Sequence, residues 1–186
     1  TVSVINAATN TLTASVATGN GPFGVAVTPN GASVYVANSA SNSVSVINTA
    51  TNIVTATVTV GSSPKGVSIS PDGSTVYVTN NASNTVSVIN TVTNTVTATV
   101  AVGLNPLGVS VTPNGSRVYV ANSVSNSVSV INAATNTVTN TVAVGNSPYS
   151  LGNFIGPAPS SQPTPVPTLS QWALILLGVL MGCVAV

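Results

Sequence analysis

Very few side chains in this 186-residue sequence could do chemistry. Lys65, Asp72 and Arg117 are the only charged residues, histidine is absent, and Cys183 is the only cysteine. General acid–base catalysis needs a positioned titratable pair, and a zinc or calcium site needs several His, Cys or carboxylate ligands. We therefore expect no catalytic, cofactor-binding or metal-ligating residues and no enzyme activity, although a weak calcium site of backbone carbonyls stays open.

The sole carboxylate lies in a turn-forming sequence, Pro71-Asp72-Gly73. Residues 42 positions away on either side are Asn30 and Asn114, each followed by glycine. Asp and Asn accept local backbone hydrogen bonds at turns, so we expect Asp72 to shape a turn. Lys65 and Arg117 have no charged counterparts at this spacing, and we expect them to be tolerated surface substitutions.

The composition excludes one class of partner. The net charge is +1, and Ser, Thr and Asn supply 73 of the 186 residues. Nucleic-acid binding depends on several Lys or Arg contacts with phosphates. We expect a neutral, hydroxyl- and amide-rich surface and no nucleic-acid partner.

The elements that must position these residues repeat every 42 residues, as the spacing of Pro22, Pro64, Pro106 and Pro148 shows. A period of this length is typical of repeat architectures. Three copies are complete and the chain enters the array within a copy. The complete copies are 19–60, 61–102 and 103–144; residues 1–18 match the second half of a copy, and 145–156 match its opening.

Each copy predicts four β-strands. Apolar residues alternate with polar ones, which is the period of a strand. The turn sequences Pro71-Asp72-Gly73, 80–84 and 90–94 separate four such runs. In the copy 61–102 the alternating positions are Val67 and Ile69, then Val76 and Val78, then Val86 and Val88, and finally Val96, Ala98, Val100 and Val102.

A four-stranded unit of this length has the size of a β-propeller blade. We therefore predict an all-β fold, a propeller of antiparallel blades spanning residues 1–156, with about three and a half blades present. Three arrangements stay open. The partial copies could close a fourth blade that lacks its second strand, the chain could be part of a longer propeller, or the hairpins could stack as a solenoid.

One aromatic and one amide side chain recur in every complete copy. We expect the tyrosines to pack between adjacent blades, with the hydroxyl near an edge; an aromatic array that stacks sugars is the alternative. These repeat-signature residues are Tyr35 and Asn38, Tyr77 and Asn80, and Tyr119 and Asn122.

The sequence Tyr77-Val78-Thr79-Asn80, with YVAN at 35–38 and 119–122, resembles the YVTN family of β-propeller repeats. The whole 42-residue register agrees, over about residues 1–156. The resemblance implies a propeller, often of seven blades, in bacterial and archaeal secreted or cell-surface proteins. It implies no single reaction, because fold alone does not define function.

The C-terminal part carries a second resemblance. Residues 157–167 form a Pro/Ser-rich linker, and 168–186 form an apolar tail that we expect to be a short hydrophobic helix. The tail resembles the IPTL-type sorting signals of Gram-negative bacteria, which implies processing by an exosortase-type protease. The residues of the signal are Val166, Pro167, Thr168, Leu169, Ser170 and Trp172.

These observations predict an exported, non-enzymatic scaffold or interaction protein. It would reside at the cell surface or outside the cell, after transient anchoring in the inner membrane by its tail, and its partner would be an unidentified surface protein or glycan. The first alternative is a ligand- or glycan-binding module that uses the channel mouth or the loops 38–43, 80–85 and 122–127. A remote alternative is the C-terminal fragment of a propeller enzyme whose catalytic residues lie in further blades.

Overall fold

The computed structural model describes residues 1–150 and residue 155. Contacts separate Thr1–Gly156 from the rest of the chain. The described residues form three four-stranded sheets and one two-stranded sheet, which we call blades 1, 2 and 3 and the half-blade. The predicted tail helix and the sorting-signal residues lie outside the described residues.

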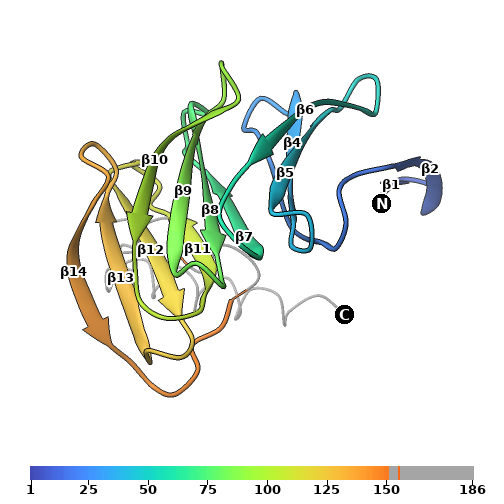
Figure 1. Ribbon diagram of the computed structural model, residues 1–186. Helices are drawn as coiled ribbons and strands as arrows, with labels where there is room; N and C mark the ends of the chain where they lie inside the picture. The colour runs from blue at the N-terminus through green and yellow to red at the C-terminus, as the bar shows by residue number, and fades with distance from the viewer. Residues whose placement is uncertain (151–154, 156–186) are drawn as a thin grey trace, which may run out of the picture. The chain divides into compact units, whose positions relative to one another are not determined.

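All neighbouring strands are antiparallel and follow one another in chain order (Figure 1). The half-blade is β1 (Val2–Asn6) and β2 (Thr11–Val16); blade 1 is β3 (Pro22–Val27), β4 (Ser33–Asn38), β5 (Ser43–Asn48) and β6 (Ile53–Thr59); blade 2 is β7 (Pro64–Ile69), β8 (Thr75–Asn80), β9 (Thr85–Asn90) and β10 (Thr95–Ala101); blade 3 is β11 (Pro106–Val111), β12 (Arg117–Asn122), β13 (Ser127–Asn132) and β14 (Thr137–Ala143).

The predicted turns are confirmed. Gly73, in the β7–β8 turn, has a φ of +75°, a conformation that costs glycine little because it has no Cβ. Asn84 and Asn94 end the next two turns of blade 2 with φ of +58° and +52°. Asparagine is one of the few other residues that tolerate this left-handed region, which explains why it recurs at these positions.

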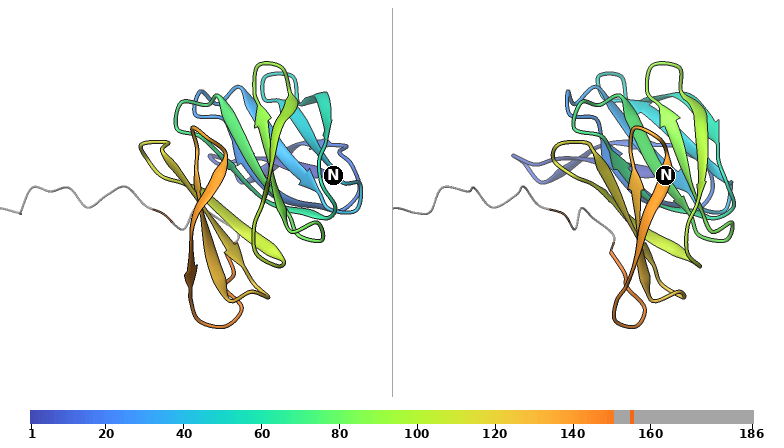
Figure 2. Two further views of the ribbon diagram at one scale, coloured as in Figure 1. Left: turned by 60° about the vertical axis from the view of Figure 1, so that its left-hand side comes forward. Right: turned by 90° about the vertical axis from the view of Figure 1, so that its left-hand side faces the viewer.

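Each complete blade packs against its neighbours through its sheet faces (Figures 1 and 2). Tyr35 and Val44 of blade 1 share a buried cluster with Val76 and Ile89 of blade 2. On the other face of blade 2, Tyr77 and Val88 share a second cluster with blade 3. Both faces of the central sheet are therefore apolar, and each complete blade depends on the neighbours that cover it.

The first strands of successive blades lie close together at the blade boundaries. The first strand of blade 2, β7, contacts both β3 of blade 1 and β11 of blade 3. A Cβ added to Gly66 of β7 would overlap the Leu107 carbonyl oxygen, and one added to Gly24 would overlap that of Lys65. Glycine is therefore required where neighbouring first strands meet. No short sequence pattern indicates this role, because the two strands that meet belong to different copies.

The two ends of the array differ in how well the first strands are covered. Val109 and Val111 of β11 are 3% and 8% exposed, whereas Val25 and Val27 of β3 are 58% and 56% exposed. The half-blade covers only the outer part of blade 1, through the cluster that contains Val16. The described residues thus place no first or second strand of a preceding blade over β3.

A small closed ring, one of the three arrangements that the sequence left open, does not form among the described residues. β1 and β2 lie at one end of the series of sheets and β14 at the other (Figure 1). Ser147 N donates to Asn126 Oδ1 at 2.9 Å, just as Ser63 N donates to Asn42 Oδ1 at 2.8 Å between blades 1 and 2. Residues 145–150, which follow β14, therefore continue toward a further blade position; the assignment of the whole segment 145–156 to the opening of a copy stays a prediction.

Candidate binding site between blades 2 and 3

The repeat-signature asparagines tie strands together inside each blade. Asn80 Nδ2 donates to Thr85 Oγ1 at 3.0 Å and to Ser87 Oγ at 2.9 Å, and its side chain is fully buried. Asn38 and Asn122 make the corresponding bonds in blades 1 and 3. Their position between the second and third strands makes them structural residues.

Tyr35 and Tyr77 pack between blades, as predicted, whereas Tyr119 of β12 is only partly buried and belongs to neither inter-blade cluster. Tyr35 is buried, and its hydroxyl donates to Asn94 Oδ1 of blade 2 at 2.8 Å. Burial raises the pKa of Tyr35. Burial also raises the pKa of Tyr77, and the negative charge of Asp72 raises it further. Buried rings of this kind are not platforms for stacking sugars.

Asp72 forms the predicted turn. Its Oδ1 accepts from Ser70 Oγ at 2.5 Å and from the backbone and hydroxyl of Ser74 at 3.0 and 2.9 Å. The Ser70 hydroxyl bond, followed by the bonds from Ser74, lowers the pKa of Asp72. Asn30 accepts from Thr28 Oγ1 at 2.7 Å in the corresponding turn of blade 1. The turn thus accepts either an amide or a carboxylate, and only the carboxylate adds charge.

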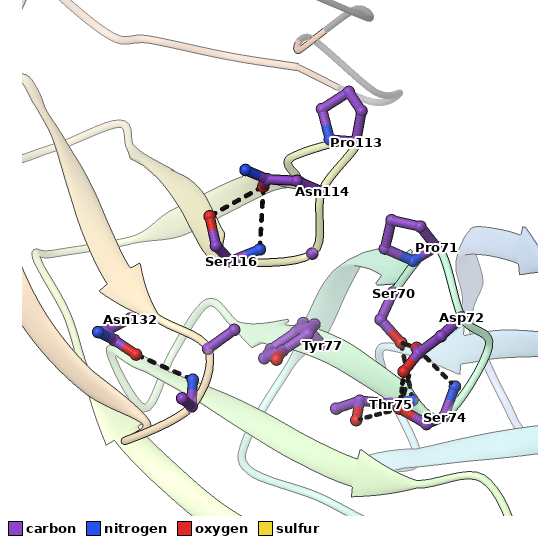
Figure 3. A pocket seen from close by; sticks show the side chains of 13 residues that line it. Ser70, Pro71, Asp72, Ser74, Thr75, Tyr77, Pro113, Asn114, Ser116 and Asn132 are labelled. Carbon is purple, nitrogen blue, oxygen red and sulfur yellow. Dashed lines mark hydrogen bonds between the residues drawn. The ribbon is translucent and has the colours of Figure 1, made fainter.

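A pocket of about 530 Å³ lies between blades 2 and 3, and the β7–β8 turn with Asp72 forms one of its walls (Figure 3). The opposite wall comes from the β11–β12 turn with Asn114 and from the β13–β14 turn with Ala133. Tyr77 lies between the two walls (Figure 3). These turns lie at one end of the strands, and the loops 38–43, 80–85 and 122–127 lie at the opposite end. A role of those loops in binding stays a prediction.

A small residue helps to open this pocket. In blade 2, Thr91 Oγ1 donates to the carbonyls of Gly73 at 2.8 Å and Ser74 at 3.1 Å, and so joins two turns. Blade 3 has Ala133 at this position and makes no such bond among the described residues. Gly115, the counterpart of Gly73 in blade 3, lines the pocket.

The tyrosine contact also differs at this boundary. Asn136, the counterpart of Asn94, has a buried Oδ1 without a hydrogen-bond partner in the described part of the chain. The Tyr77 hydroxyl therefore does not make the bond that Tyr35 makes one blade earlier. The pocket is lined by Asp72, Gly115 and Tyr77, whose carboxylate, backbone and hydroxyl groups can bind hydrogen-bond donors but supply no activated nucleophile.

The two cationic residues lie away from the pocket lining. Lys65 Nζ lies 4.2 Å from the centre of the Phe23 ring, a cation–π contact between neighbouring first strands. Lys65 and Phe23 occupy equivalent positions in successive copies, so only the approach of β3 and β7 reveals the contact. Arg117 begins β12 and is exposed, as predicted.

The fold of three stacked four-stranded sheets matches a known protein family. A family model for YNCE-like β-propellers matches residues 1–74 and 67–157. The chain belongs to the YNCE-like β-propeller family. This confirms the predicted propeller-repeat resemblance.

Solved structures show the same fold as this YNCE-like propeller. Hydrazine synthase from Kuenenia stuttgartiensis is 28% identical, with a TM-score of 0.68 over 73% of this chain and 40% of that chain. A functionally unknown protein from Desulfotomaculum acetoxidans DSM 771 is 20% identical, with a TM-score of 0.66 over 75% of this chain and 47% of that chain. The YNCE-like propeller spans less than half of either chain, and no curated protein matches it.

The second predicted resemblance is also confirmed. Residues 164–186 of the YNCE-like propeller match the IPTL-CTERM motif. This motif indicates an exported protein with a C-terminal sorting tail. Among residues 1–150 and 155, no helix is long and apolar enough to span a bilayer.

Proposed function

We propose that this protein is a non-enzymatic exported scaffold, displayed at the cell surface or released after sorting through its tail. The observation that carries the proposal is the IPTL-CTERM match at 164–186, which follows a YNCE-like propeller match that ends at residue 157. The two modules have separate tasks. The tail directs sorting of the exported protein, and the propeller is the part that is displayed.

The propeller suits display because its exposed turns carry polar groups that are almost all uncharged. Asn48 Oδ1, for example, accepts the backbone amides of Ala50 and Thr51 at 3.0 Å each, which holds the β5–β6 turn in one conformation. Asn90 and Asn132 hold the corresponding turns of blades 2 and 3. Turns organised in this way present a fixed hydroxyl and amide surface whose interactions depend little on salt.

The tail would act as a transient membrane anchor. Residues 172–186 contain no charged side chain, and Trp172 at their start suits the membrane–water interface. We propose that this segment forms a short helix in the inner membrane and that an exosortase-type protease recognises the sorting signal before it. The linker 157–167 would keep the propeller clear of the bilayer.

Deleting residues 166–186 tests the scaffold proposal. We expect the protein to move from the membrane fraction to the soluble or released fraction when cells are fractionated and probed by immunoblotting. Deletion of 157–163 is the control, because it shortens the linker and keeps the whole segment that matches the motif. An unchanged distribution after removal of 166–186 would contradict the proposed sorting.

The pocket between blades 2 and 3 favours a second candidate function, a module that binds a small ligand or glycan. Its volume lies within the range of about 300–1,000 Å³ that is usual for ligand sites. Pull-down of the full chain on immobilised surface polysaccharides tests this function. We expect the polysaccharide to retain the unmodified chain and to retain the Ala133→Thr variant less, because the added side chain would enter the pocket. Equal retention of the unmodified chain and the variant would contradict this binding function.

A further inference from the structure

Two departures from the 42-residue repeat meet in the same pocket. Asp72 replaces the asparagine found at the corresponding positions of blades 1 and 3, and it lines one wall. Ala133 stands where blades 1 and 2 have threonine and the half-blade has Ala7, and it lines the other wall. The first departure adds a negative charge and the second removes a side chain that would fill space.

The Asp72 carboxylate keeps acceptor capacity that the turn does not use. Three bonds, from Ser70 Oγ and from the backbone and hydroxyl of Ser74, converge on Oδ1. Oδ2 accepts only the Ser74 hydroxyl, at 2.9 Å. An ionised carboxylate has about four lone-pair sites, so Oδ2 can accept a further strong hydrogen bond.

No cationic side chain lines the pocket to neutralise this charge. Lys65 instead lies over the Phe23 ring. Gly115 and Tyr77 also line the pocket; a backbone carbonyl is an acceptor only, whereas a tyrosine hydroxyl both donates and accepts. The pocket therefore combines one uncompensated negative charge with neutral polar groups and a half-open shape between two turns (Figure 3).

We propose that this pocket binds a small polyhydroxylated molecule that carries a primary ammonium group, as an amino sugar does. The ammonium donates to Asp72 Oδ2, and hydroxyl groups of the ligand bond to the Gly115 carbonyl and the Tyr77 hydroxyl. This ligand class rests on the binding function given above as the second candidate. An ammonium group matches the charge, and hydroxyl groups match the neutral acceptors.

Calorimetric titration of the full chain in a neutral detergent tests the proposal with D-glucosamine as the probe. D-Glucose and N-acetyl-D-glucosamine are the matched ligands, since they keep the ring but carry no ammonium group. We expect D-glucosamine to bind at least roughly tenfold more tightly than either, as a charge-assisted hydrogen bond would produce.

Three variants locate the site, and each uses a residue that the repeat already tolerates. Asp72→Asn keeps the turn, because Asn30 makes the same local bonds, and should reduce D-glucosamine affinity by roughly tenfold. Ala133→Thr should reduce the affinity for all ligands by filling the pocket. Asn30→Asp is the control: it adds the same carboxylate in blade 1, where Thr91 occupies the facing turn, and should not add a second site.

The outcomes separate the ligand class from the binding function. One outcome is that the protein binds D-glucosamine and D-glucose with equal affinity, and that Ala133→Thr reduces both affinities while Asp72→Asn reduces neither. This outcome would overturn the proposal of an ammonium-bearing ligand and would leave a binding site for neutral sugars. Absence of binding by all three sugars would overturn the proposal for this pocket. If the Ala133→Thr variant is retained on polysaccharide as well as the unmodified chain, the binding function lies elsewhere on the protein. That result would also overturn the proposal for this pocket.

Discussion

The Tyr35 hydroxyl donates a 2.8 Å hydrogen bond to Asn94 Oδ1, which joins the second strand of blade 1 to the β9–β10 turn of blade 2. The same residue types occur at Tyr77 and Asn136, but there the Asn136 oxygen is buried without a hydrogen-bond partner. Identical repeat positions thus make different contacts at successive blade boundaries. The boundary that lacks the bond is the one that holds the pocket.

Tyr35→Phe should lower the free energy of unfolding by about 1–3 kcal/mol, because it removes the hydrogen bond and leaves Asn94 Oδ1 unpaired in a partly buried site. Tyr77→Phe is the matched control and should cost less than about 0.5 kcal/mol, since the Tyr77 hydroxyl makes no such bond. Urea unfolding followed by tyrosine fluorescence or circular dichroism measures both. Equal losses in the two variants would show that the Tyr35–Asn94 bond adds nothing to stability.

Gly66→Ala should destabilise the propeller by about 1–3 kcal/mol or more, because its new Cβ would overlap the Leu107 carbonyl oxygen and push β7 away from β11. Gly145→Ala is the control, since a Cβ there meets no atom within 4 Å. Thermal unfolding monitored by circular dichroism compares them. A Gly66→Ala protein as stable as the Gly145→Ala protein would mean that the first strands do not pack as closely as described.

Ala133→Thr should stabilise blade 3 by about 0.5–1.5 kcal/mol, the usual net value of one hydrogen bond, because it would join the β13–β14 turn to the β11–β12 turn of the same blade. The new hydroxyl should donate to the Gly115 carbonyl, as Thr91 Oγ1 donates to the Gly73 carbonyl. Thr91→Ala is the reciprocal variant and should lose a similar amount. Urea unfolding of both variants checks the pair, and two changes of the same sign would refute the assignment.

Stability should vary little with pH between about 4 and 10. The pKa of Asp72 is lowered in the folded protein, so its contribution is present above the unfolded pKa of about 3.9 and is lost as the pH falls through the folded pKa. Tyr35 and Tyr77 have raised pKa values, so their contribution is full below about 10 and is lost as the pH rises through the folded pKa.

Melting temperatures measured from about pH 2 to about pH 11 check that expectation and cover the acid-side loss. Asp72→Asn should abolish most of the acid-side loss, since Asp72 is the only side-chain carboxylate in the sequence. A steep loss of stability between pH 5 and 9 would contradict the assignment of these groups.

The sequence predicted the repeat unit well because its signals are local. Alternation of apolar and polar residues in 61–102 predicts β7 to β10, and the Pro71-Asp72-Gly73 turn lies where it was expected. The role of Asp72 in its turn also followed from sequence alone, since Asn30 and Asn114 show what the position requires. The pocket did not follow, because its walls come from turns of two different blades.

What the sequence alone determined is the 42-residue blade, its four strands and its turns, because each depends on residues a few positions apart. The tertiary structure decided which groups meet across blades. Tyr35 reaches Asn94, Lys65 lies over Phe23, and Gly66 admits the Leu107 carbonyl only once neighbouring sheets have packed. The physical reason is that the packing distance and angle between sheets, which no short sequence pattern encodes, set these contacts.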